Sequence, residues 1–250
     1  MKDTQTEQQE IADSVKLEAS SLSPQEDARA RALYQKVLDG IISDYGEFIP
    51  QSIKENPRHI IGRIITVENV PEIIKIWDPP VLEAKANIAK AAYFRDSKVI
   101  VMSNQKAWEN LSDEEKSYLR QRFGSPEDLF NVYISLYRIG HELAHSISAK
   151  GLPEKFEEIG ADYYGTEYTR GMFPGPGVDF LSDDTHARLD FYQKLIDTHG
   201  DNVHRVFFGT GEPITRTKIL RELDQSKVKA LHPQRTWLHK QPKAPVTAQK

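Results

Sequence analysis

The sequence comprises 250 residues, of which 38% are hydrophobic, enough to bury the core of one full-size domain or of two small ones. A formal net charge of −4 without a basic stripe argues against a nucleic-acid-binding protein, and the absence of cysteine excludes disulfides and thiolate metal ligands. The polar N-terminus lacks the apolar segment of a signal peptide and no stretch approaches the roughly 18 apolar residues of a membrane helix, so we expect a cytoplasmic protein without membrane association, unless a leader has been removed.

The N-terminal region is predicted to be a tail followed by one helix. Residues 1–22 are polar and charged, and we expect them to be disordered. Ser23 begins a capping box, Ser-Pro-Gln-Glu, and the apolar stripe after it ends near Gly46. This pattern is typical of an amphipathic helix that packs on a core.

A small sheet is predicted next. Residues 60–67 are rich in β-branched side chains and read as a strand. Two further apolar runs, 88–94 and 98–102, flank Arg95-Asp96-Ser97, which favours an antiparallel hairpin. Together with the helices that follow, these strands predict an α+β fold with a small, mostly antiparallel sheet.

The remainder of the chain is predicted to be helical. A capping box begins at Ser112, and Ser125-Pro126 followed by two acids is a strong helix start. The expected helical ranges are 105–124, 126–149, 153–170, 183–199 and parts of 201–231, with a solvated tail at 240–250.

The helix predicted over 126–149 carries the stretch His141-Glu142-Leu143-Ala144-His145. Histidines four residues apart lie on one face of a helix, so both rings can reach one metal ion. Glu142 lies about 100° around the helix from His141 and can take a proton from a water bound to that metal. Two imidazole ligands for zinc and a carboxylate base are the physical logic of the H-E-x-x-H motif.

The third ligand is expected on the next helix. The turn between the helices is short, which predicts an antiparallel pair. His145 lies roughly 6 Å before the end of the first helix and Glu158 roughly 7.5 Å into the second, so the two are level. Glu157 is also level but is predicted to point elsewhere, whereas Ala161 and Gly165 share the face of Glu158 and allow the helices to approach closely.

Asp162 lies one turn beyond Glu158 on the same face. It is placed to accept a hydrogen bond from a ligand histidine and to fix the tautomer of that ring. Glu158 is the preferred third ligand because it is level with His145 and has the longer reach, and Asp162 is kept as the alternative.

The pattern His141-Glu142-x-x-His145 followed by Glu158-x-x-x-Asp162 resembles the gluzincin branch of zinc metallopeptidases. The resemblance implies that His141, His145 and Glu158 bind one zinc ion, that Glu142 is the general base and that Asp162 orients His141. It covers about 25 residues at motif level. The 13 positions from His145 to Glu158 are fewer than in most gluzincins and resemble the compact members of the group.

The resemblance also implies a fold and a domain division. The fold would be zincin-like, with the small sheet ahead of a metal-binding helix pair and a helical C-terminal region. A single catalytic domain over 23–239 would divide into a helix-and-sheet part, 23–124, and a helical part with the metal site, 125–239. The strand 98–103 would be the edge strand that holds an extended substrate, by offering unpaired backbone groups, and a hairpin with a structural role alone is the alternative.

We therefore expect a zinc metalloendopeptidase that acts on peptide or protein substrates. Glu142 would accept a proton from the zinc-activated water and return it to the leaving amine. The residue that stabilises the oxyanion is left open among Tyr163, Tyr164, Tyr168, His59, His186, His199, His204, His232 and His239.

Two alternatives remain from the sequence. One is a metal-binding protein of the same fold that is latent, acts as a sensor or cleaves one specific target. The other is a helical binding module in which the motif is accidental. Another divalent ion in place of zinc is also compatible with these ligands, and neither the substrate nor the oligomeric state follows from the sequence.

Overall fold

The computed structural model describes residues 39–40, 42–55, 63–67, 69–71, 74, 90–95, 98–103, 105–172 and 176–229, with the backbone alone at 63–67 and at a few other positions. The predicted tails, 1–22 and 240–250, lie outside the described residues. So does most of the helix predicted from Ser23, of which residues 39–40 and 42–45 are described and are helical.

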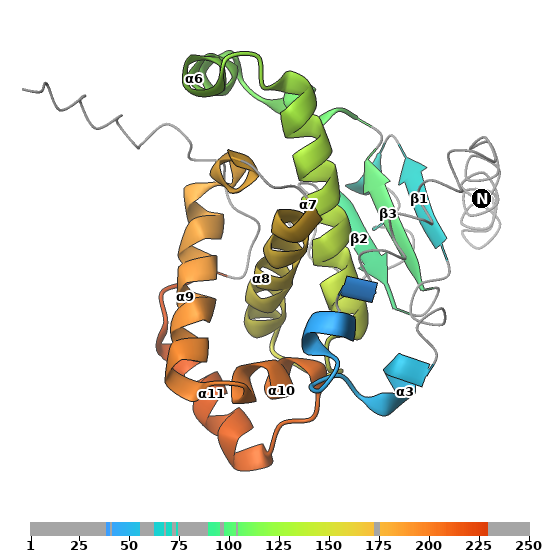
Figure 1. Ribbon diagram of the computed structural model, residues 1–250, viewed down its shortest axis with the longest axis vertical. Coiled ribbons are helices and arrows are strands. Elements are labelled where there is room, and N and C mark those ends of the chain that lie inside the picture. Colours follow the sequence, from blue (N-terminus) through green and yellow to red (C-terminus); the bar gives the residue numbers. More distant parts are fainter. Residues whose placement is uncertain are drawn as a thin grey trace, which may run out of the picture.

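Two long helices occupy the centre of the molecule (Figure 1). α7 spans Glu127–Ile147 and α8 spans Glu154–Met172, close to the predicted ranges. Pro126 occupies the N-cap of α7 without a side-chain cap, so the predicted cap at Ser125 is wrong by one residue. Gly151 in the connecting turn has a φ of +74°, the left-handed conformation that favours glycine there.

The two central helices are antiparallel and touch through glycine. A Cβ added to Gly165 of α8 would lie 2.8 Å from the backbone nitrogen of His141, and one added to Gly140 would lie 3.0 Å from Cα of Gly165. Glycine at both positions therefore brings the helix axes unusually close together. The prediction that Gly165 permits a close approach is confirmed, and Ala161 beside it is fully buried.

The sheet has three described strands in the order β1-β3-β2. β1 (Arg63–Val67) runs parallel to β3 (Val99–Ser103), and β2 (Ala91–Phe94) runs antiparallel to β3. The predicted hairpin is confirmed, with Ala91 opposite Met102 and Phe94 opposite Val99.

Two expectations about the sheet are wrong. The described strands make one parallel and one antiparallel pair, so the part of the sheet that they form is mixed and not mostly antiparallel. The strand over 98–103 is the central strand β3, and β1 and β2 are the outer strands among those described. Val99, Ile100, Val101 and Met102 are all buried, and such a continuous apolar run is typical of a strand with neighbours on both sides and covered faces.

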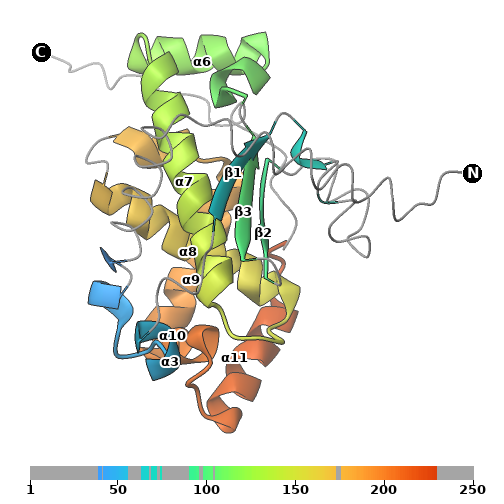
Figure 2. The same cartoon turned by 90° about the vertical axis from the view of Figure 1, so that its right-hand side faces the viewer.

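The helices stack beside the sheet in layers (Figures 1 and 2). α7 packs on β2 and β3, α8 packs on α7, and α9 (Asp183–His199) packs on the far side of α8. α10 (Asn202–Phe208) and α11 (Pro213–Gln225) close one end of this arrangement. α6 (Asp113–Phe123) lies at the other end, and its predicted capping box at Ser112 is present.

Short elements complete the fold. The 3₁₀ helices η2 (Ala107–Asn110) and η3 (Pro176–Phe180) pack against α7, and α3 spans Gln51–Glu55. The main core joins the sheet to α7, α8, α9, α10 and α11, and a second cluster around Trp108, Phe130 and Phe180 surrounds the first turns of α7. The fold class is α+β, as predicted. None of the described helices has the length and apolarity needed to span a bilayer.

Candidate metal centre

The two motif histidines meet on one face of α7. Nε2 of His141 lies 3.1 Å from Nε2 of His145, and the ring centroids are 4.8 Å apart. The face is shared because the two residues are four apart, just over one helical turn. His141 is buried, with 4% of its surface exposed.

Glu158 brings a carboxylate from α8 to the same point. Its Oε2 lies 3.5 Å from Nε2 of His141 and 3.8 Å from Nε2 of His145. The three side chains offer ligand atoms within 4.8 Å of one another, as the sequence predicted for this set. His145 and Glu158 can meet although only 13 positions separate them, because the short turn places the last turn of α7 level with the first turns of α8.

The donor set fits a zinc ion. A tetrahedral zinc with bonds of about 2.0–2.1 Å holds its ligand atoms roughly 3.3 Å apart. The observed separations of 3.1, 3.5 and 3.8 Å bracket that value, so only small side-chain adjustments are needed. Two imidazole nitrogens and one carboxylate oxygen also match the chemistry of catalytic zinc sites, which keep a fourth position open.

Asp162 lies behind His141, on the side away from the cluster. Its Oδ1 is 2.9 Å from Nδ1 of His141, and its Oδ2 is 2.9 Å from Nε of Arg188 on α9. The hydroxyl of Tyr137 also donates to Oδ1. Because Asp162 contacts the outer nitrogen of the ring, the geometry favours its expected orienting role over the alternative role of third ligand.

Glu157 lies behind His145, as Asp162 lies behind His141, and is not part of the ligand cluster, so the prediction that it points away from the metal position is confirmed. Its Oε1 is 3.2 Å from Nδ1 of His145 and accepts a 2.6 Å hydrogen bond from the Ser148 hydroxyl. Arg95, just after β2, donates to the same oxygen. Each histidine thus has a carboxylate at Nδ1, which favours a proton there and leaves the Nε2 lone pair for a metal.

Glu142 lies on the sheet side of α7. Its side chain is buried, and the backbone N–H of Tyr93 on β2 donates a hydrogen bond to its carboxyl group. Burial raises the pKa of Glu142, and the nearby charges of His141 and His145 act in the opposite direction. A carboxyl group with a raised pKa, beside the two histidines, is suited to accept and return a proton.

The other ionisable groups of the site respond to their neighbours. Burial lowers the pKa of His141, but Asp162 and Glu158 on either side of the ring raise it to a net value of about 10. A metal must therefore displace a firmly held proton from this ring. Burial raises the pKa of Glu157, but hydrogen bonds from His145 and Ser148 and the charge of Arg95 lower it to about 2.

Asp162 remains ionised for a similar reason. Burial alone would raise its pKa, but Arg188, His141 and Tyr137 lower it below its usual value. Arg188 is itself buried, with 2% of its surface exposed. Sequence patterns gave no signal for Arg188 or Tyr137 at this site, because both roles depend on tertiary packing.

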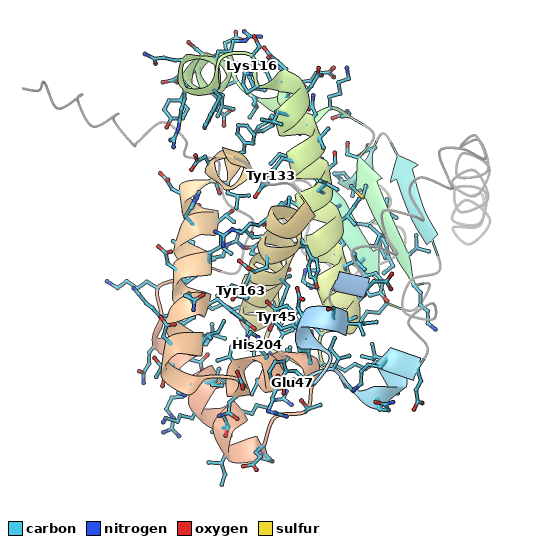
Figure 3. All side chains as sticks on the ribbon, viewed as in Figure 1. Tyr45, Glu47, Lys116, Tyr133, Tyr163 and His204 are labelled. Atoms are coloured by element: carbon cyan, nitrogen blue, oxygen red, sulfur yellow. The ribbon has the colours of Figure 1, made fainter. Side chains whose placement is uncertain are left out.

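Most of the residues considered for stabilising the oxyanion make their contacts outside the His141–His145–Glu158 cluster. The hydroxyl of Tyr164 bonds to Nδ1 of His204 at 2.6 Å, within the main core. Tyr163 lies beside Tyr45 and His204 near α10 (Figure 3). Three more candidates also have other partners or neighbours: Nε2 of His199 contacts Glu222, Nδ1 of His186 contacts Ser182, and Tyr168 packs against Gly40. His59, His232 and His239 lie outside the described residues.

Comparisons of the chain with protein-family models, with curated proteins and with solved structures found no match.

Proposed function

We propose that this protein is a zinc-dependent metalloendopeptidase of the gluzincin type with a zincin-like fold. The observation that carries the proposal is the convergence of His141, His145 and Glu158 on one point, with separations of 3.1 to 3.8 Å between their ligand atoms. Glu142, the expected base, is buried beside the two histidines.

In this proposal each residue has a separate task. His141, His145 and Glu158 hold the ion, which supplies a Lewis acid and an acidified water when bound. Glu142 accepts the proton of that water and returns it to the leaving amine. Asp162 keeps the His141 ring in position through its contact with Nδ1.

The charge of the site supports a divalent cation. Four carboxylates, those of Glu142, Glu157, Glu158 and Asp162, surround the two histidines, and two guanidinium groups, those of Arg95 and Arg188, face them. Metal ligation requires both imidazoles to be neutral, and these groups then leave two negative charges that a divalent ion would neutralise. Without a metal, the proton held by His141 offsets one of them, and burial of the remaining charge is costly.

The first test is the metal content of purified wild type, Glu158→Ala and Asp162→Ala. The proposal expects close to one zinc per wild-type chain, loss of the metal in Glu158→Ala and weaker retention in Asp162→Ala. Loss confined to Asp162→Ala would move the third ligand to Asp162, and the same analysis identifies any other divalent ion. A wild-type protein without metal, unchanged in melting on adding a chelator, would overturn the proposal.

The second test concerns the reaction. Glu142→Gln is expected to retain zinc and to lose peptide hydrolysis, because the amide cannot accept the water proton. Substantial hydrolysis by this variant would contradict the role assigned to Glu142.

One observation favours a second candidate, a zinc protein of the same fold that is latent or specific for one target. Only 4% of His141 and 5% each of Glu142 and Glu158 are exposed, and the Glu142 carboxyl group already accepts one hydrogen bond from a backbone N–H. A generic peptide needs an accessible base. Full zinc occupancy with no hydrolysis of generic peptides would favour this candidate over the general endopeptidase.

A further inference from the structure

Arg95 connects the end of strand β2 to the metal cluster. Its Nη2 lies 2.5 Å from Oε1 of Glu157 and 2.6 Å from the hydroxyl of Ser148, the C-cap residue of α7. Its Nη1 lies 3.4 Å from the carbonyl oxygen of Ser148. The guanidinium group therefore binds the end of α7 and the beginning of α8 together.

Three donors converge on a single oxygen atom, Oε1 of Glu157. They are the guanidinium of Arg95, the hydroxyl of Ser148 at 2.6 Å and Nδ1 of His145 at 3.2 Å. A glutamate has three rotatable side-chain bonds, so it needs fixed partners to hold its carboxylate in one place. Arg95 and Ser148 provide them, and the carboxylate in turn fixes the His145 ring.

The two histidines are supported from different parts of the fold. Behind His141, Asp162 contacts Arg188 of α9, and both side chains of this pair are almost fully buried. Behind His145, the side chains of Arg95 and Glu157 are 35% and 21% exposed. A partly exposed ion pair adds little stability by itself, so the Arg95–Glu157 pair is better explained by what its carboxylate contacts, the Nδ1 of His145.

We propose that Arg95 is a positioning residue for the metal ligand His145, acting through Glu157. The inference rests on the proposed metal site. It makes β2 a support of the metal centre, because the same strand donates the Tyr93 N–H to the expected base, Glu142. Displacement of this strand would therefore disturb both the His145 ligand and the base.

The experiment measures zinc affinity by competition with a chromophoric chelator, together with the visible spectrum of the Co²⁺-loaded protein. Arg95→Ala is expected to lower zinc affinity about tenfold and Glu157→Gln about ten- to a hundredfold. Both should alter the Co²⁺ bands, which report the ligand geometry. Arg95→Lys, which keeps the cation, should recover part of the affinity.

A double variant tests whether Arg95 acts through Glu157. Arg95→Ala combined with Glu157→Gln should bind zinc no more weakly than Glu157→Gln alone, because the path is already broken. The matched control is Arg120→Ala, which removes another arginine–glutamate pair, Arg120 with Glu127 at 2.8 Å, on an exposed surface. It should leave the affinity and the spectrum unchanged.

Several outcomes would overturn the proposal. Wild-type affinity and an unaltered Co²⁺ spectrum in folded Arg95→Ala would do so, as would a full additional loss of affinity in the double variant. If Arg95→Ala does not fold, Arg95→Gln, which retains the aliphatic stem, is judged by the same criteria.

Absence of metal binding in wild type would overturn this inference and the metal site together. Zinc binding without peptide hydrolysis would count against the proposed reaction alone, and the affinities would still decide the role of Arg95.

Discussion

At the scale of single residues, the two ring nitrogens of each histidine in the site have different neighbours. Nε2 of each ring faces the cluster, and Nδ1 of each ring faces a carboxylate, that of Asp162 or of Glu157. The two carboxylates differ in their exposure to solvent, because Asp162 is 1% exposed whereas the side chain of Glu157 is 21% exposed. Loss of its charge should therefore affect both folding and metal binding.

We predict that Asp162→Asn destabilises the metal-free protein by about 3 to 5 kcal/mol, because the buried guanidinium of Arg188 loses the carboxylate that lies 2.9 Å from its Nε. Zinc affinity should fall about ten- to a hundredfold at the same time, because the His141 ring loses its orienting carboxylate. Urea unfolding of the metal-free protein measures the first effect, and chelator competition measures the second.

The control removes both charges. The double variant Asp162→Asn with Arg188→Met should regain most of the lost stability, because both members of the buried ion pair are then neutral. Its zinc affinity should stay low. A double variant as unstable as Asp162→Asn would show that the stranded charge of Arg188 is not the cause.

At the scale of elements, local signals identified the helices and the hairpin, whereas long-range contacts escaped them. The spacing of apolar residues and the turn at Gly151 located α7 and α8, and from these the level of Glu158 followed. Helix geometry also showed that Glu157 does not point at the metal position, but it did not predict the contact of Glu157 with Nδ1 of His145. Helix geometry gives the direction in which a side chain leaves the backbone, and the long glutamate side chain can bend from that direction.

The errors in the sheet have a similar origin. Sequence signals for a hairpin are local, but the parallel pairing of β1 with β3 joins Arg63 to Val99 across a long connection. The continuous apolar run of β3 is typical of a central strand, but the family resemblance led to the expectation of an edge strand. Arg95 lies 62 positions from Glu157, so no local pattern could connect them.

The close helix contact gives the next prediction. Gly165→Ala would place a methyl group 2.8 Å from the backbone nitrogen of His141, and backbone cannot rotate away. The helices must separate, which should cost about 1 to 3 kcal/mol and weaken zinc binding, because the ligands come from both helices. Urea unfolding and chelator competition measure these effects.

Ser135→Ala on the exposed face of α7 is a suitable control for this substitution, since it changes a small side chain without affecting the helix interface. Its stability should change by less than about 0.5 kcal/mol. Equal effects of Ser135→Ala and Gly165→Ala would contradict the packing argument.

His204 on α10 should make stability depend on pH. Its ring lies beside Tyr45 and bonds to the hydroxyl of Tyr164 at 2.6 Å (Figure 3). Burial lowers its pKa from 6.5, and Asp201 acts weakly in the opposite direction. The unfolded chain therefore binds a proton at higher pH than the folded one. The contribution of His204 to stability is complete above the unfolded pKa and is lost as the pH falls through and below it.

The measurement is the melting temperature of the metal-free protein at about pH 7.5 and about pH 5.5, a window that spans the ordinary histidine pKa. His204→Gln keeps a hydrogen-bonding group for Tyr164 but cannot titrate. The melting temperature of His204→Gln should therefore fall less than that of wild type when the pH is lowered from about 7.5 to about 5.5. An equal loss in both proteins would assign the pH dependence to other groups.

At the scale of the whole molecule, the proposed ligands join two helices that the sheet and α9 hold from opposite sides. His141 and His145 belong to α7, which packs on β2 and β3, and Glu158 belongs to α8, which packs on α9. A bound ion would therefore connect the layers of the fold. Metal binding to the folded state should then raise the free energy of unfolding of the whole domain.

We predict that zinc raises the melting temperature and that a chelator lowers it. At a free zinc concentration a thousandfold above its dissociation constant, the folded state gains about 4 kcal/mol. For a chain of this length that gain corresponds to a rise on the order of 10 °C. Glu142→Gln should show the same rise, because all three proposed ligands remain. His145→Ala should lose most of it, and an equal rise in His145→Ala would mean that zinc stabilises the protein from a different site.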